Sequence, residues 1–152
     1  MDTWHGHFPI THFVLQALLK KKAAPETSEL SRAESVLFNA CEFWAAVAKR
    51  ELTPYLEPRL VPRLLLAFEA FSEIGAVRVA SALRMALTDC PEVPSSTWLR
   101  HKAFVLEARL LDTEDAVDEL IAHYATEHLT RHSSERQQPV ATQLSRTTGP
   151  GN

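Results

Sequence analysis

Two histidines near the end of the last helical pattern have the spacing of a metal-binding pair. His128 and His132 lie four residues apart, which places both imidazoles on one face of a helix. Zinc sites normally use three or four protein ligands, and the neighbouring carboxylate, Glu127, is expected to point elsewhere on the helix. The sequence therefore favours a chain without a cofactor, with a metal site at His128 and His132 as the alternative.

The densest charged segment of the chain is acidic and lies at the start of the same helical pattern. Its members are Asp112, Glu114, Asp115, Asp118 and Glu119. Negative side chains in a first turn are stabilised by the partial positive charge at a helix N-terminus, which explains much of this run. The functional alternative is an acidic surface that attracts a basic partner protein, with an affinity that falls as salt rises. We predict these residues as a partner-binding site.

A single carboxylate inside an apolar pattern is a candidate for acid–base chemistry. Glu42 lies beside Cys41 and Trp44, and a buried carboxylate there would have a raised pKa. A residue next to a buried helix position usually turns toward the rim, which favours a solvated or capping role. The chain has no glycine-flanked nucleophile, phosphate loop or dinucleotide fingerprint, so the sequence favours a non-enzymatic function.

The two cysteines, Cys41 and Cys90, fall on a helix and at a helix end, where both are expected to be small buried residues. The low cysteine count and an N-terminus without the pattern of a signal peptide predict a reducing, cytoplasmic location, although spacing leaves a disulfide open. No apolar run approaches the roughly twenty residues that cross a bilayer. We expect a soluble protein without membrane association.

Length and charge limit the classes of fold and partner. The chain has 152 residues, of which 45% are hydrophobic, and this size predicts one domain with one core. Its 16 basic and 19 acidic residues give a formal net charge of −3. Without a basic patch, direct nucleic-acid binding is not expected.

Apolar spacing predicts the helices that must position these groups. Two helical patterns meet at Ile74-Gly75-Ala76, where a left-handed glycine can close the first helix. Ser31 and Glu34 have capping-box spacing at the start of a wide apolar stripe, which predicts a central helix.

The remaining helices follow from similar signals. Thr11 is predicted to cap a helix to about Lys22, and Asp112 or Thr113 to cap the last one. The inward residues of the first of these are predicted to be Phe13, Val14, Ala17 and Leu18, and a helix after Ser96 is predicted to carry Trp98, Leu99, Phe104, Val105 and Leu110.

No segment shows the alternation of a strand, so the predicted fold is all-α. We expect a single compact bundle of about five to six helices in residues 1–132, including an irregular N-terminal arm over residues 1–10. Residues 133–152 are rich in Ser, Thr, Gln, Pro and Gly, and are predicted to be a disordered tail.

The order of these motifs resembles a bacterial all-helical family of unknown function that includes a DNA-mimic protein. The resemblance covers about Leu30 to His128, and the segments that carry it are Leu30 to Trp44, Ala67 to Ala76, Val79 to Leu83, Leu111-Asp112 and Ala122 to Tyr124. Members of the family carry an Asn-Gly-Gly-Phe element after the acidic residue, whereas Glu42 is followed here by an apolar helical stretch. The resemblance implies an all-helical fold and transfers no functional residue.

DNA mimicry itself is not supported by the charge pattern. A mimic is expected to display a continuous acidic face, yet arginines are spread among the acids of this chain. They are Arg59, Arg63, Arg78, Arg84, Arg100 and Arg109.

The sequence therefore predicts a protein that acts by binding another protein, as a regulator, inhibitor or immunity-type protein. Exposed aromatics at Trp4, Phe8 and Tyr55 would suit such an interface. The alternative is a metal- or small-ligand-binding helical domain, or an enzyme, that uses an interhelical pocket with Glu42 or the C-terminal histidines. Oligomeric state is left open.

Overall fold

Every regular element in the described part of the chain is helical, which confirms the all-α prediction. The computed structural model describes residues 4–24 and 29–129, so the predicted tail lies outside them. The elements are α1 (Trp4–His7), α2 (Pro9–Ala23), α3 (Arg32–Ala48), α4 (Leu52–Leu56), a short 3-10 turn (Glu57–Arg59), α5 (Leu60–Glu73), α6 (Val77–Asp89), α7 (Ser96–Leu111) and a C-terminal helix over residues 117–129. None of these helices has both the length and the apolar character to span a bilayer.

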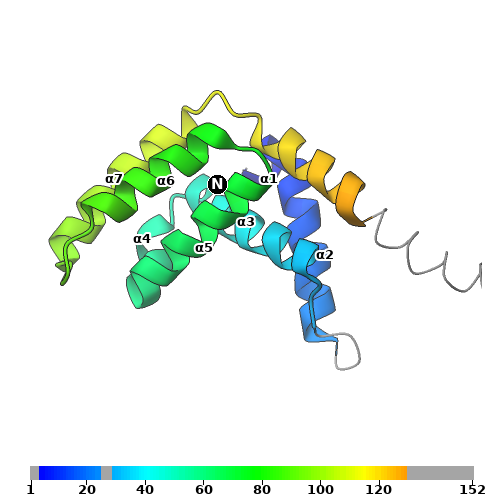
Figure 1. Cartoon of the computed structure of the whole chain (residues 1–152), viewed down its shortest axis with the longest axis horizontal. Helices are drawn as coiled ribbons and strands as arrows, with labels where there is room; N and C mark the ends of the chain where they lie inside the picture. The colour runs from blue at the N-terminus through cyan, green and yellow to red at the C-terminus, as the bar shows by residue number, and fades with distance from the viewer. Residues whose placement is uncertain (1–3, 25–28, 130–152) are drawn as a thin grey trace, which may run out of the picture.

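Helix α3 is the centre of the fold, as its wide apolar stripe predicts. It packs against α2, α4, α5 and α7 (Figure 1). Phe43 and Trp44 are fully buried and meet Phe71 of α5 edge to face, with ring centroids 5.9 and 6.0 Å away. Such aromatic pairs add roughly 0.5–1.5 kcal/mol beyond the burial of their area, so α3 and α5 form a rigid centre.

The described part of the N-terminal arm, residues 4–10, is largely helical and contributes to the core, which corrects the prediction of an irregular segment. Trp4 in α1 is only 6% exposed, and Phe8 lies half-buried with its ring 5.6 Å from that of Trp44. Tyr55 is also half-buried. The prediction of exposed aromatics at these positions is therefore wrong for Trp4, because its indole is buried in the core beside α2.

Helix α2 begins at Pro9, so the prediction of Thr11 as its cap is wrong, and its inward face agrees with the predicted one at Leu18 and in part at Val14. Leu15 and Leu18 are buried, whereas Phe13 is 73% exposed and Ala17 is exposed. Apolar residues occupy both sides of this helix, so spacing alone does not choose between them. Packing against α3 selects the face that carries Leu15.

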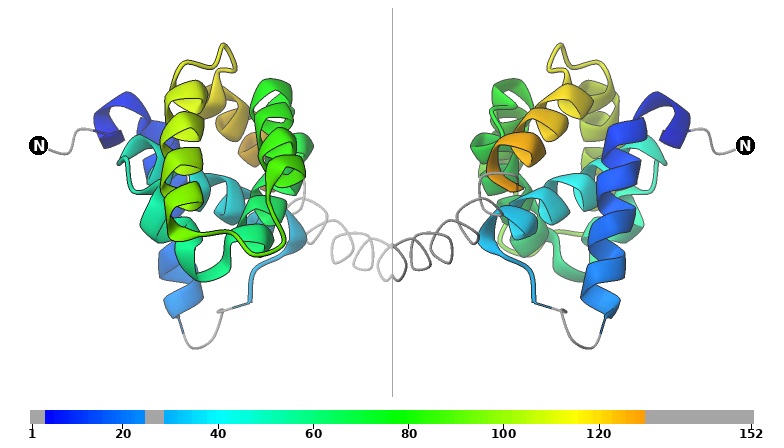
Figure 2. Two further views of the ribbon diagram at one scale, coloured as in Figure 1. Left: turned by 90° about the vertical axis from the view of Figure 1, so that its left-hand side faces the viewer. Right: turned by 90° about the vertical axis from the view of Figure 1, so that its right-hand side faces the viewer.

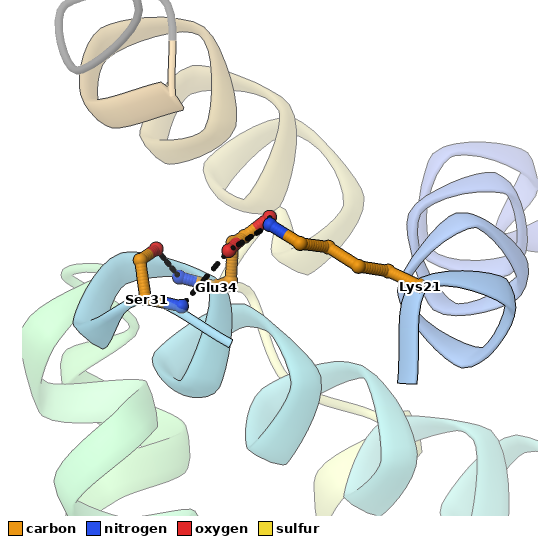
Figure 3. A network of polar contacts seen from close by, with 3 residues as sticks. All are labelled: Lys21, Ser31 and Glu34. Atoms are coloured by element: carbon orange, nitrogen blue, oxygen red, sulfur yellow. Dashed lines mark hydrogen bonds and ion pairs between the residues drawn. The ribbon is translucent and has the colours of Figure 1, made fainter. Parts of the chain in front are cut away.

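The start of α3 carries the predicted capping box, and a lysine from α2 joins it. The Ser31 hydroxyl accepts the Glu34 N–H, and the Glu34 carboxylate accepts the Ser31 N–H at 2.9 Å and the Lys21 ammonium at 2.7 Å (Figure 3). Burial opposes ionisation of Glu34, but these hydrogen bonds together lower its pKa below the usual value. The network therefore stabilises the fold above the ordinary carboxyl pKa, and this contribution is lost as the pH falls through the lowered value.

Helices α5 and α6 form a hairpin that turns at Gly75. Gly75 has a φ of +88°, in the left-handed region, and the Ala76 N–H donates to the Phe71 carbonyl at 2.9 Å. This geometry satisfies carbonyls at the end of α5, which confirms the predicted role of the glycine. The chain then runs along α6 and returns along α7, which lies beside it (Figures 1 and 2).

The last two helices differ in detail from the predicted pattern. Helix α7 is capped by Ser95, whose hydroxyl accepts the Trp98 N–H, and it buries Leu99 and Leu110 as expected. Phe104 is 66% exposed and Val105 is 45% exposed, because α7 lies at the outside of the bundle and buries one face only. The C-terminal helix begins at residue 117, later than a cap at residue 112 or 113 would place it.

Replacing Gly75 with alanine is predicted to lower the free energy of unfolding by about 1 kcal/mol, because a Cβ disfavours the left-handed backbone. No heavy atom lies within 4 Å of the added Cβ, so the loss comes from backbone conformation alone. Urea unfolding followed by circular dichroism measures it. Gly6→Ala, in α1 and equally uncrowded, is the matched control and is expected to cause no loss; equal losses in both variants would contradict this account.

Candidate functional site

Two of the predicted partner-binding acids are used inside the molecule as helix caps. The Asp118 carboxylate accepts the backbone N–H groups of Ile10 at 3.0 Å and Thr11 at 2.7 Å, together with the Thr11 hydroxyl at 2.8 Å. The Asp115 carboxylate accepts the N–H groups of Arg78 at 2.8 Å and Val79 at 3.0 Å. These contacts bind the C-terminal segment to the first turns of α2 and α6.

The two caps occupy the same place in their respective helices. The residues that precede α2 and α6 are Phe8 and Ala76, and neither has a side chain that can accept a hydrogen bond. In each helix the distant carboxylate takes the N–H groups of the second and third residues, as a serine or aspartate at the N-cap would do. Because neither N-cap residue has an accepting side chain, the first N–H groups of α2 and α6 need an acceptor from elsewhere in the chain. This lack of a local cap was the signal in the sequence.

The other three acids of the run remain at the surface. Asp112, Glu114 and Glu119 are exposed, and Glu114 pairs with the exposed guanidinium of Arg78. Asp112 and Glu114 line an open groove of about 610 Å³ between the ends of α6 and α7, whereas Glu119 does not. The structure thus brings two of the five predicted acids together at a groove and directs two others to helix ends.

Apolar side chains continue this groove along both helices. Met85 follows Ser81 of the groove by one turn of α6, and Val105 precedes Ala108 and Arg109 of the groove by one turn of α7. Met85 is 47% exposed, and its sulfur lies 3.7 Å from an Arg109 guanidinium nitrogen, which joins the two helices. We call this area the α6–α7 surface, defined by Arg78, Ser81, Met85, Val105, Ala108, Arg109, Asp112 and Glu114.

The predicted histidine pair lies only in part within the described residues. The ring of His128 stacks on that of Tyr124, with centroids 4.0 Å apart, and His132 lies outside the described part. The His123 Nε2 lies 3.3 Å from a Glu127 carboxylate oxygen, a contact with a histidine outside the predicted His128 and His132 pair. No group of three or more metal-ligating side chains is found across residues 4–24 and 29–129.

The cysteines are free thiols in the described part of the chain. Cys41 is fully buried, as predicted, and burial together with the negative charge of Asp118 raises its pKa to about 12. It is therefore protonated at neutral pH and is unsuited to nucleophilic chemistry. Cys90 is half-buried rather than fully buried, because it lies where α6 ends.

Glu42 lies at the rim of the core, in agreement with the favoured interpretation. It is half-buried on α3 and accepts a hydrogen bond from the Tyr55 hydroxyl at 3.3 Å. Burial and the adjacent Glu42 charge raise the pKa of Tyr55, so this phenol is a hydrogen-bond donor at neutral pH. The pair lines a hollow between α2, α3 and α4.

Sequence reasoning missed one buried acid, Glu107 of α7. Glu107 is only 7% exposed, and one of its carboxylate oxygens has no hydrogen-bond partner. Burial raises the pKa of this carboxyl group above its usual value. A hydrogen bond from the backbone of Leu52, the first residue of α4, and the positive charge of Arg50 oppose that shift. The signal was present, since Glu107 lies one turn from both Ala103 and Leu110 on the buried face of α7.

Comparisons with protein-family models, with curated proteins and with solved structures find no match to this chain. The resemblance to the family that includes a DNA mimic stays a prediction. Residues 43–47, where that family has its glycine-containing element, lie within α3.

Replacing Asp118 with asparagine is predicted to lower the free energy of unfolding by about 1–2 kcal/mol. The amide has one acceptor oxygen and no charge, so it cannot hold both N–H groups of α2 as the carboxylate does. Urea unfolding measures the loss. Glu119→Gln, at the exposed neighbouring position, is the control, and a loss of the same size in both variants would refute the capping role.

The buried carboxylate of Glu107 predicts a specific pH dependence. Its raised pKa means that its contribution to stability is fully present below the ordinary carboxyl pKa and is lost as the pH rises through the higher folded value. Glu107→Gln is therefore expected to gain stability relative to the wild type between pH 4 and pH 7. Urea unfolding across this range tests the sign, and a difference that does not change with pH would contradict it.

Proposed function

We propose that this chain is a non-enzymatic protein-interaction domain that binds another protein through the α6–α7 surface, in a regulatory, inhibitory or immunity-type role. The observation that carries the proposal is an apolar centre beside a charged groove on two neighbouring helices. Met85 and Val105, which continue the groove along α6 and α7, are 47% and 45% exposed. Protein interfaces combine an apolar centre with a polar rim, which is the arrangement found here.

The charges of the rim favour a partner with both signs of charge. Arg78 and Glu114 are paired at the surface, and the Arg109 guanidinium contacts Met85. Asp112 is exposed and has no ion pair within the described residues, so it can accept a basic group from the partner. Such exposed charges contribute more to the rate and specificity of association than to its affinity, and the contribution falls with salt.

The rigidity of the surface also supports this role. Asp115 lies between Asp112 and Asp118 in the sequence, and its bonds to Arg78 and Val79 hold the connecting segment against the start of α6. Binding to a preformed surface avoids part of the entropy lost when a flexible segment becomes ordered.

Affinity capture from a lysate of the native host tests the proposal when wild type, Met85→Glu and Thr97→Glu are compared. The first variant places a charge in the apolar centre, and the second adds the same charge at an exposed position in the first turn of α7. We expect the wild type and Thr97→Glu to retain a stoichiometric protein partner, and Met85→Glu to recover at least about tenfold less, equivalent to 1.4 kcal/mol.

Asp112→Asn is expected to weaken the same complex at low salt and to have little effect at high salt, because salt screens an exposed charge. Bound protein, nucleic acid and metal are analysed together. Recovery of no specific protein, or equal recovery with Met85→Glu and Thr97→Glu, would refute the proposed function.

A further inference from the structure

A second concave region lies away from the α6–α7 surface, between α2, α3 and α4. Its volume is about 380 Å³, which is enough for a small organic molecule. Its apolar walls come from Leu15 and Leu19 of α2 and from Ala45 and Ala46 of α3. The two alanines leave the space open, because larger side chains at these positions on α3 would fill it.

Two carboxylates line this hollow without a cation paired to either of them. Glu42 is half-buried and Glu51 is exposed, and neither forms an ion pair within residues 4–24 and 29–129. The single lysine of the lining, Lys49, directs its ammonium toward the ring of Trp4, with a distance of 5.6 Å to the centroid. The lining therefore combines an apolar floor with an excess of negative charge.

Tyr55 fixes the position of the more buried carboxylate. Its hydroxyl donates to Glu42 Oε1 at 3.3 Å, and its ring contacts that of Phe43 edge to face and the Arg63 guanidinium, which lies 4.5 Å from the ring centroid. Arg63 also donates to the Tyr55 carbonyl at 2.6 Å. Only one oxygen of Glu42 is engaged in this way, and a carboxylate has room for further donors.

We propose that this hollow binds a small organic cation, a primary ammonium that carries a short apolar chain. The ammonium group donates to Glu42 and Glu51, and the chain lies against Leu15, Leu19 and the two alanines. A primary ammonium has three N–H donors, which suits two carboxylates that line the same apolar hollow. This site is separate from the α6–α7 surface, so the two proposals stand or fall independently.

The test is an NMR titration of the full chain with three probes of four carbon atoms each: n-butylammonium, n-butanol and butyrate. The proposal predicts saturable shifts of the amide signals of Glu42, Ala46, Glu51 and Tyr55 with n-butylammonium, and no saturable shifts with the other two. The neutral n-butanol measures binding by apolar contact alone, and the negatively charged butyrate measures binding by attraction to Lys49.

Glu42→Gln removes the charge and keeps an oxygen that can accept the Tyr55 hydroxyl, so the fold is retained. We expect it to weaken n-butylammonium binding by about tenfold. Glu69→Gln, an exposed acid on α5 outside this hollow, is the charge-matched control and is expected to bind as the wild type does. Shifts that do not saturate, equal effects of the three probes, or equal affinities of the two variants would each overturn the proposal.

Discussion

The fold depends on carboxylates that complete the N-termini of helices distant in the sequence. The first N–H groups of a helix have no partner within it, and they carry a partial positive charge. Asp118 accepts these groups in α2, Asp115 accepts them in α6, and Glu107 receives a backbone hydrogen bond from Leu52 at the start of α4. Since Asp118 and Ile10 are 108 residues apart, one side chain joins the two ends of the domain.

A carboxylate that caps a helix inside the molecule is not available to a partner, whereas an exposed carboxylate is. Within a short acidic segment, Asp115 and Asp118 point to helix ends, while Asp112, Glu114 and Glu119 are exposed. A dense acidic run in a sequence therefore overstates the acidic surface of the folded protein. The Asp115 cap holds this segment at the start of α6, where Asp112 and Glu114 line a groove with residues of α6 and α7, and this groove is the basis of the proposed interaction surface.

The half-buried Glu34 and the buried Glu107 show that contacts to carboxylates differ in their effect on stability. Glu34 lies among hydrogen-bond donors from Lys21 and Ser31, and its lowered pKa indicates that its charged form is stabilised in the fold. Glu107 has an oxygen without a partner and a raised pKa, so its charge is accommodated at a cost. The hydrogen bond that Glu107 accepts from Leu52 at the start of α4 gives a structural reason for an acid within the buried face of α7.

The sequence by itself determined the local structure: the helices, the Ser31 and Glu34 capping box, the central α3 and the Gly75 turn. These depend on residues within one or two helical turns, and their spacing is visible in the chain. Tertiary structure decided which face of α2 is buried, why Trp4 lies in the core, and which acids cap distant helices. Those outcomes depend on contacts between residues far apart in the sequence, such as Asp118 with Thr11, whose geometry exists only when the helices have packed.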